Sequence, residues 1–417
     1  MRMMLLTAGT RGDVEPFVAL ARYVASRAHE VRLAVPTGAD VPDGLDVVRF
    51  DLDARRVLPA PGATPWALAR HLRDEVRPAM AGMLSAAVRE TVAFAPDVVV
   101  HHALVLTAPL AADALGVPRV LVELAPVATP SAELPAAGGP TATRELGRWN
   151  RATYAVPRAA ARVFDAEVAR AAAQLPTGSR PARRTPSRAT LMAVSPQLVP
   201  RPRDWPARVH LTGHWHDDTP ADVDPAVAAF VAGGRHLVAS FGSMAAGAAG
   251  RRGEQRARDR ARDRARDRAE HRARGVITAA RAHGLRTLLL TGWGGLALPD
   301  DLRGPDVLAV PAAPFGSVLP GAALVVHHGG AGTTHAVARA GVPSVVVPVT
   351  ADQPFWAARL HRRGIAAAPV PLRRLSAATL LPAVADALGR REAAAEVGRL
   401  VRQEDGLAAA LDVLTAL

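Results

Sequence analysis

The chain has 417 residues, of which 49% are hydrophobic and 21% charged, so a small single module and a globally disordered chain are both excluded. It contains no Cys, and all 51 basic residues are Arg, which excludes disulfides, thiolate metal sites and every mechanism that uses a lysine. The formal net charge of +13 permits binding of an acidic partner without requiring it.

The first half alternates short apolar strands with segments of helical spacing. The chain begins with an apolar run that ends at Thr7, too short for a membrane span or an export signal, so we expect a cytoplasmic protein. This alternation predicts βαβ units and a parallel sheet covered on both faces. The predicted strands are 3–7, 31–35, 47–50, 97–100 and 119–124, and the predicted helices are 14–26, 66–94 and 106–115.

Proline then recurs between residues 176 and 220, which predicts a linker or an extended connection. After it the alternation restarts, so we expect an α/β protein with two doubly wound halves facing each other across a hinge. The predicted strands are 236–240, 287–291, 308–310, 323–327 and 344–347, and the predicted helices are 333–340, 377–388, 391–402 and 407–417.

Residues 250–275 carry a tetrapeptide repeat, Ala-Arg-Asp-Arg, followed by a degenerate Ala-Glu-His-Arg. Eleven Arg and five acidic residues lie between 251 and 274. On a helix, a four-residue period places like charges at i,i+4, so the segment is expected to be a solvated helical extension or a disordered loop inserted into the second half. The alternative is a contact with nucleic acid or an anionic membrane, but no aromatic residue is present for base stacking.

The first glycine-rich turn follows the first strand and contains Thr10 and Asp13. Asp13 lies at the start of a helix, where capping is its ordinary role. Because the carboxyl ends of parallel strands are where α/β domains bind ligands, Asp13 is also a candidate for chemistry. His101, His102 and Glu123 follow two other predicted strands and are further candidates, although each is more often structural.

The second glycine-rich turn leads from the strand 323–327 into a helix. Bare N–H groups at a helix N-terminus bind anions, and glycines let a diphosphate approach the backbone. His328 and Thr333 could each add a hydrogen bond to a phosphate oxygen. Asp352 follows Gly332 by about 20 residues, the spacing of a dinucleotide-binding fingerprint, but the last glycine of that fingerprint is missing. A nicotinamide or flavin oxidoreductase therefore remains as an alternative.

Four motifs together resemble family 1 glycosyltransferases of the GT-B fold, in particular the branch of glycopeptide-antibiotic glycosyltransferases and sterol or lipid glucosyltransferases. They are Gly9-Thr-Arg-Gly-Asp-Val-Glu-Pro16, Thr291-Gly-Trp-Gly-Gly295, His327-His-Gly-Gly-Ala-Gly-Thr-Thr334 and Ala351-Asp-Gln-Pro-Phe-Trp356. The resemblance runs nearly end to end, interrupted by the arginine repeat. It implies two facing Rossmann-like domains with a cleft between them. The implied parts are an acceptor-binding domain at 1–205, a linker at 206–220, a nucleotide-sugar-binding domain at 221–400 and a helix at 401–417 that returns to the first domain.

The resemblance also implies the activity, which is inverting transfer of a sugar from a UDP- or dTDP-sugar to a hydroxyl of a lipophilic or polycyclic natural-product aglycone. Asp13 stands where many relatives carry a catalytic His, and it would act as the base. The diphosphate would lie against His328, Gly330, Gly332 and Thr333, with Gly329 and Ala331 in the same turn. Ser243 would approach the nucleotide or its phosphates, Trp293 would line the base pocket, and Asp352 and Gln353 would bind sugar hydroxyls.

The family needs no metal and no tightly bound cofactor, because the nucleotide-sugar is a co-substrate. The expected partners are the donor and a small aglycone, without nucleic acid, and a weak contact with a membrane surface is compatible with the sequence. We expect a monomer or a homodimer. The alternatives are a sterol or lipid glucosyltransferase, the oxidoreductase, and a polyanion-binding protein that uses the arginine repeat.

Overall fold

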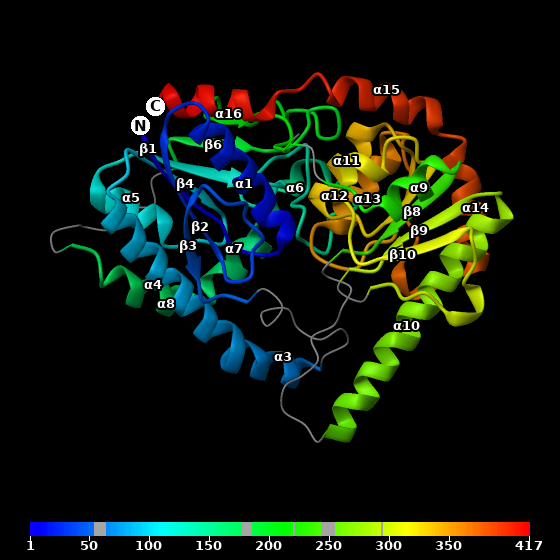
Figure 1. The fold of residues 1–417 in the computed structure, drawn as a ribbon. Coiled ribbons are helices and arrows are strands. Elements are labelled where there is room, and N and C mark those ends of the chain that lie inside the picture. Colours follow the sequence, from blue (N-terminus) through cyan, green and yellow to red (C-terminus); the bar gives the residue numbers. More distant parts are fainter. Residues whose placement is uncertain (54–63, 177–185, 218, 220–221, 243–254, 293–294) are drawn as a thin grey trace. The chain divides into compact units, whose positions relative to one another are not determined.

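The computed structural model describes residues 1–53, 64–176, 186–217, 219, 222–242, 255–292 and 295–417 (Figure 1). The chain forms two compact units. Unit 1 comprises Met1–Pro196, Pro200–Asp217 and Asp405–Leu417, and unit 2 comprises Gln197–Val199 and Asp218–Glu404. Each unit is an α/β domain around one parallel sheet, so the predicted fold class is confirmed.

The sheet of unit 1 has seven parallel strands in the order β3-β2-β1-β4-β5-β6-β7. The strand order reverses between β1 and β4, and ligands of such sheets bind outside the carboxyl ends of the strands at this point. The strands are β1 (Arg2–Leu6), β2 (Glu30–Pro36), β3 (Asp46–Phe50), β4 (Val98–His102), β5 (Arg119–Glu123), β6 (Ala189–Met192) and β7 (Val209–Leu211).

Helices cover both faces of this sheet. Successive residues of β1 point to opposite faces: Leu5 packs in a core with α1 and α16, and Leu6 packs in a second core with α4, α5 and α8. The helices are α1 (Arg11–Ala25), α3 (Pro65–His71), the π-helical turn η1 (Leu72–Val76), α4 (Arg77–Phe94), α5 (Ala108–Leu115), η2 (Gly147–Trp149), α6 (Asn150–Thr153), α7 (Ala155–Arg162), α8 (Asp165–Ala172) and α16 (Gly406–Thr415).

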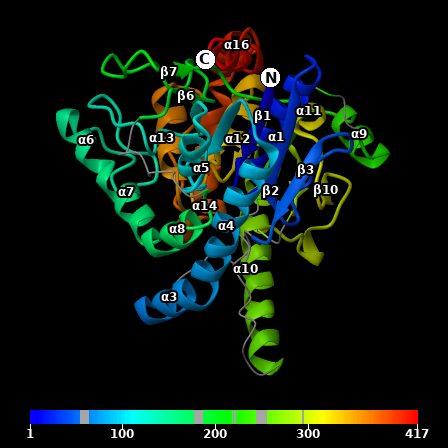
Figure 2. The same ribbon diagram turned by 90° about the vertical axis from the view of Figure 1, so that its left-hand side faces the viewer.

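The chain end belongs to unit 1. Ala410 and Leu414 of α16 are fully buried in the core that contains α1. Gly406 begins α16 against the backbone of unit 1, because a Cβ there would lie 2.7 Å from the carbonyl oxygen of His214. Both chain ends lie on the same side of the unit (Figures 1 and 2).

Unit 2 contains a five-stranded parallel sheet in the order β10-β9-β8-β11-β12, which reverses between β8 and β11. One face packs against α10 and α14, and the other packs against α9, α11 and α12. The strands are β8 (His236–Ser240), β9 (Arg286–Leu290), β10 (Val307–Val310), β11 (Leu324–His327) and β12 (Ser344–Val346). The helices are α9 (Pro225–Ala232), α10 (Gln255–Ala282), η4 (Asp300–Leu302), α11 (Phe315–Val318), α12 (Ala331–Ala340), α13 (Gln353–Arg362), η5 (Leu372–Arg374), α14 (Ala377–Leu388) and α15 (Arg391–Val401).

The structure differs from the sequence-based prediction in the proline-rich segment. β6 and β7 lie between residues 176 and 220, and β7 lies inside the segment 206–220 for which we expected a linker. Both strands extend the sheet of unit 1, and neither contains a proline, so the prolines flank the strands without interrupting their hydrogen bonds.

From Gln255 onward, the arginine repeat lies in the first part of α10, which extends away from the sheet of unit 2 (Figures 1 and 2). The side chains from Arg262 to Arg268 are exposed, and burial begins at Ala269 and Ala273. Where the repeat degenerates, Glu270 replaces an Arg and forms an i,i+4 ion pair with Arg266 at 2.7 Å. This change gives the exposed segment an i,i+4 pair of opposite charge, which the regular repeat lacks.

Candidate functional site

The turn between β1 and α1 fixes Asp13 by its own backbone. Asp13 Oδ2 accepts hydrogen bonds from the backbone N–H of Thr10 at 2.7 Å and from the Thr10 hydroxyl at 3.1 Å. Gly9 adopts φ of +130°, and a Cβ at residue 9 would lie 2.2 Å from Asp13 Oδ2. Only glycine fits at this position, so the turn holds the carboxylate in one place.

The other carboxylate oxygen of Asp13 faces His102, the last residue of β4. Asp13 Oδ1 lies 3.9 Å from His102 Nε2, and the ring of His102 meets the edge of Phe17. The side chain of Asp13 is 31% exposed, whereas that of His102 is 10% exposed. Burial lowers the pKa of His102, although the charge of Asp13 raises it in part. A partly exposed carboxylate thus stands beside a buried, neutral imidazole.

The two other acceptor-side candidates have structural partners. His101 donates from Nδ1 to the carbonyl of His102 at 3.2 Å, and burial lowers the pKa of His101 to about 4. Glu123 is 1% exposed, and its Oε2 accepts the backbone N–H groups of residues 127, 128 and 129. Its other oxygen accepts the hydroxyl of Thr129. The carboxylate of Glu123 therefore holds the loop that follows β5, a role that the sequence does not reveal.

The turn between β11 and α12 brings its backbone close to neighbouring elements. Gly329 adopts φ of +87°, and a Cβ there would lie 2.7 Å from Val346 Cγ1. Gly330 begins α12 without a side-chain cap, and the first hydrogen bond of the helix runs from Thr334 N to Gly330 O. The N–H groups of Ala331, Gly332 and Thr333 therefore have no partner within the helix and form a site suited to an anion.

Two histidines precede this turn. His327 Nδ1 accepts the N–H of Gly329 at 3.1 Å, and burial lowers the pKa of His327 to about 3. The ring of His328 is enclosed by two glycines: a Cβ on Gly242 would lie 2.6 Å from its Cε1, and one on Gly330 would lie 2.6 Å from its Nε2. Burial lowers the pKa of His328 to about 4. His328 is therefore neutral, and it offers a hydrogen bond in place of a positive charge.

The residues predicted to bind the sugar shape the turn between β12 and α13. Asp352 Oδ2 accepts the indole N–H of Trp356 at 2.8 Å. Gln353 is 2% exposed, and its Oε1 accepts the N–H groups of Val349 at 2.7 Å and Thr350 at 3.1 Å. Ala351 lies in the same turn and has φ of +57°, which is a strained conformation for alanine.

Two of the predicted donor contacts, Ser243 and Trp293, lie outside the described residues. Within the part of the chain that the structure describes, three or more acidic, His or Cys side chains do not cluster as metal ligands. The helices described are also too short or too polar to cross a membrane.

Comparisons of sequence identify relatives along the whole chain. Residues 3–123 match the N-terminal domain of glycosyltransferase family 28, and residues 295–409 match the C-terminal domain of erythromycin biosynthesis protein CIII-like proteins. O-mycaminosyltylonolide 6-deoxyallosyltransferase of Streptomyces fradiae is 33% identical over 93% of this chain and 90% of its own length. Glycosyltransferase GtfE of Amycolatopsis orientalis is 32% identical over 100% of this chain and 97% of its own length.

Solved structures share the fold. The glycotransferase of kitacinnamycin matches with a TM-score of 0.68 at 20% identity, over 100% of this chain and 98% of its own. Spinosyn rhamnosyltransferase SpnG complexed with thymidine diphosphate matches with a TM-score of 0.60 at 18% identity, over the full length of both chains. The resemblance drawn from the motifs is thereby confirmed: the chain belongs to the family of GT-B glycosyltransferases that contains these antibiotic-tailoring enzymes, and it is a glycosyltransferase that uses a nucleotide-sugar.

Proposed function

We propose that the protein is an inverting glycosyltransferase that moves a sugar from a dTDP- or UDP-sugar to a hydroxyl of a lipophilic or polycyclic natural product, with Asp13 as the base. The position of Asp13 carries this proposal. Thr10 engages one carboxylate oxygen, and the other oxygen faces His102 at the carboxyl edge of the unit 1 sheet. This edge, at the reversal of strand order, is where the fold binds ligands.

In the proposed reaction, the oxygen of the acceptor hydroxyl attacks the anomeric carbon of the donor sugar. The bond between that carbon and the diphosphate oxygen breaks, and the hydroxyl proton passes to the carboxylate of Asp13. Attack from the side opposite the leaving diphosphate inverts the configuration of the sugar. His102 Nε2 lies 3.9 Å from Asp13 Oδ1, on the side of the carboxylate that Thr10 does not bind.

Unit 2 supplies the donor site in this proposal. The bare N–H groups at the start of α12, together with His328 and the hydroxyl of Thr333, would bind the diphosphate and stabilise the charge that develops as it leaves. Asp352 and the side-chain amide nitrogen of Gln353 would meet sugar hydroxyls from the turn before α13, while the oxygen of Gln353 holds that turn. Relatives of known structure bind thymidine diphosphate, which favours dTDP-sugars as donors.

The names of the relatives suggest which acceptors to test. They include an O-mycaminosyltylonolide 6-deoxyallosyltransferase, a vancomycin aglycone glucosyltransferase at 30% identity and a plant sterol 3-beta-glucosyltransferase at 25% identity. We therefore propose a panel of O-mycaminosyltylonolide, vancomycin aglycone and a 3β-hydroxysterol, each offered with dTDP-glucose and UDP-glucose. Product formation with the sterol alone would support the second candidate, a sterol or lipid glucosyltransferase.

Asp13→Asn tests the proposal directly. The amide keeps the shape of the carboxylate and cannot take a proton, so we expect transfer to fall by about 10²- to 10⁴-fold while the Kd of dTDP or UDP, measured by calorimetry, stays unchanged. The control is Asp40→Asn, which changes an exposed carboxylate of the same unit outside the turn. Retained turnover in Asp13→Asn would remove Asp13 from the mechanism.

A further inference from the structure

A long irregular loop follows β5. Residues 124–146 connect β5 to η2 and contain no helix or strand. Loops longer than about 12–15 residues without secondary structure are uncommon in compact domains and usually serve a binding or active site. His102 of β4 pairs with Val122 of β5, so this loop leaves the sheet beside the contact between Asp13 and His102.

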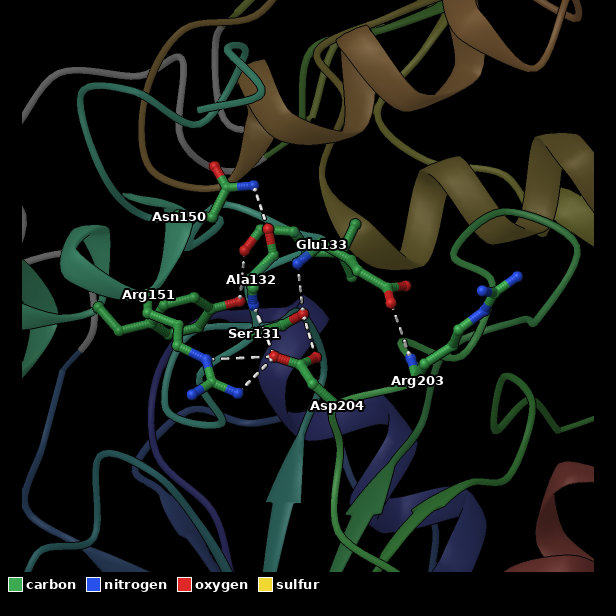
Figure 3. Close-up of polar contacts among 9 residues, drawn as sticks. Ser131, Ala132, Glu133, Asn150, Arg151, Arg203 and Asp204 are labelled. Carbon is green, nitrogen blue, oxygen red and sulfur yellow. Dashed lines mark hydrogen bonds and ion pairs between the residues drawn. The ribbon is translucent and has the colours of Figure 1, made fainter. Parts of the chain in front are cut away.

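Asp204 holds the middle of this loop from outside it. Its Oδ1 accepts the hydroxyl of Ser131 at 2.7 Å, and its Oδ2 accepts the N–H of Ala132 at 2.7 Å (Figure 3). Arg151 donates to the same Oδ2 from Nη2 at 2.8 Å. A single carboxylate thus ties the loop to the segment that contains Arg151, the short helix α6.

Side chains at and after α6 fasten the same loop at further points. Asn150 and Thr153 are buried residues of α6, and Tyr154 directly follows it. Their hydrogen bonds are Asn150 Nδ2 to Ala132 O at 2.9 Å, Leu146 N to Asn150 Oδ1 at 2.9 Å, Ala136 N to Thr153 Oγ1 at 2.8 Å and Tyr154 OH to Leu134 O at 3.2 Å. With Glu123 at its start, the loop is fixed by side chains along most of its length.

The charge on Asp204 makes its hydrogen bonds strong. Its side chain is 19% exposed, and this burial raises its pKa. The hydrogen bonds from the N–H of Ala132, from Arg151 and from the hydroxyl of Ser131 lower the pKa by more than burial raises it, so the pKa lies below its ordinary value. Asp204 is therefore ionised at neutral pH, and charge-assisted bonds are about twice as strong as neutral ones. The apolar side chains of Leu134, Ala136 and Ala137 are buried and hold the loop against the domain. The carboxylate of Asp204 additionally fixes where the backbone of the loop lies.

We propose that Asp204 is a positioning residue: by fixing loop 124–146, it sets the wall against which the acceptor is held next to Asp13. The proposal rests on the proposed function, because it assigns the acceptor to this edge of unit 1. Small displacements of such a wall have large effects, since about 1 Å of misplacement can reduce a rate by about 10²-fold.

The test compares Asp204→Asn with the wild-type protein and with Glu396→Gln, which removes an exposed carboxylate paired with Arg399 in unit 2. Transfer is measured with the panel acceptor that the wild-type protein glycosylates, and hydrolysis of dTDP-glucose or UDP-glucose is measured without acceptor. In Asp204→Asn we expect the KM for the acceptor to rise by about tenfold or more. We expect the KM for the donor and the hydrolysis rate to stay within twofold, roughly the scatter of such assays, as in the control. Ser131→Ala removes one of the bonds to Asp204, together with the bond that Ser131 Oγ accepts from the N–H of Glu133. It leaves Asp204 bound to Ala132 and Arg151, so it should show a smaller change in the same direction and keeps the test open if Asp204→Asn does not fold.

An equal loss of transfer and hydrolysis would assign Asp204 a general structural role and overturn the proposal, as would an unchanged acceptor KM. Hydrogen exchange tests the clamp without any acceptor: the amides of residues 127–136 should exchange faster in Asp204→Asn than in wild type, and unchanged exchange would also overturn it. Failure of the wild-type protein to bind dTDP and UDP would contradict the proposed function. This outcome can be told apart from failure of the Asp204 proposal, because it is seen without any change at Asp204.

Discussion

Each unit places a pair of histidines at the same point of its sheet. His101 and His102 end β4, whereas His327 ends β11 and His328 follows it. β4 pairs with β1, where His101 is in register with Leu6, and β11 pairs with β8, where His327 is in register with Ser240. β1 and β8 are the first strands of the two units in chain order. The two pairs therefore occupy equivalent positions at the reversal of strand order.

The surroundings of the second histidine differ between the units. In unit 1, His102 faces the carboxylate of Asp13, which caps a helix. In unit 2, His328 is enclosed by glycines and precedes a helix whose first N–H groups are bare. In the proposed reaction, one strand end therefore presents the group that takes up a proton, and the other presents the site for the diphosphate. The two sheets have equivalent topology at this point, so the residues of the turns β1–α1 and β11–α12 decide which ligand chemistry each sheet edge supports.

Among the variants that test this comparison, the largest expected effect comes from breaking the unit 1 turn with Gly9→Ala. The added Cβ would lie 2.2 Å from Asp13 Oδ2 in a backbone with φ of +130°, so Asp13 must move. We expect transfer to fall by about 10²-fold or more, with a loss of stability of about 1–3 kcal/mol. The control is Gly38→Ala, where φ is +80° and no atom lies within 4 Å of the new Cβ. Equal activity of the two variants would show that the fixed position of Asp13 is unimportant.

The shared burial of the histidines predicts sensitivity to acid in both units. The pKa values of His101 and His328 are lowered to about 4, so the unfolded chain takes up protons before the native protein as pH falls. Their contribution to stability is complete above about pH 6.5 and is lost as pH falls to about 4, at most about 3 kcal/mol for each. Urea unfolding at several pH values measures this slope. His328→Gln should flatten it, and the exposed His271→Gln should not.

Replacing the second histidine in each unit sharpens the comparison. His328→Ala should weaken binding of dTDP or UDP by about 1.5–3 kcal/mol, the range of a hydrogen bond to a charged group, as measured by calorimetry. His102→Ala should leave this affinity unchanged and reduce the rate of transfer. If both variants lost nucleotide affinity to the same extent, the assignment of donor binding to His328 and of transfer to His102 would be wrong.

Much of the fold follows from sequence periodicity, but the proline-rich segment does not. The strand 236–240 and the helix 377–388 have the predicted bounds, because their apolar periodicity is clear and a capping box of Ser376 and Thr379 starts the helix. β6 and β7 are short, and only pairing with the unit 1 sheet makes them strands, so local pattern gives no signal for them.

For the site, the sequence indicates which turns matter but not how each side chain is used. Glu123 and Gln353 both stand at candidate ligand positions, yet their oxygens accept backbone N–H groups of the adjacent loops. A polar side chain beside a turn can bind either the backbone or a ligand, and the path of the adjacent loop decides between the two. Asp13 differs because one of its oxygens remains directed away from its own turn, toward His102.

The smallest expected effect compares the donors that orient the two candidate aspartates, the hydroxyl of Thr10 for Asp13 and the indole of Trp356 for Asp352. Trp356→Phe keeps an aromatic side chain in the core but removes the indole N–H and leaves a small cavity. We expect the lost hydrogen bond to lower the free energy of unfolding by about 1 kcal/mol, in addition to the cost of the cavity, and the KM of the nucleotide-sugar to rise a few-fold. The Kd of dTDP or UDP should not change, because these ligands lack the sugar. Thr10→Ala should instead lower kcat a few-fold with the donor KM unchanged. An equal effect of Trp356→Phe on nucleotide and nucleotide-sugar would mean that Asp352 supports the whole turn and does not read the sugar, which would leave sugar recognition to other residues.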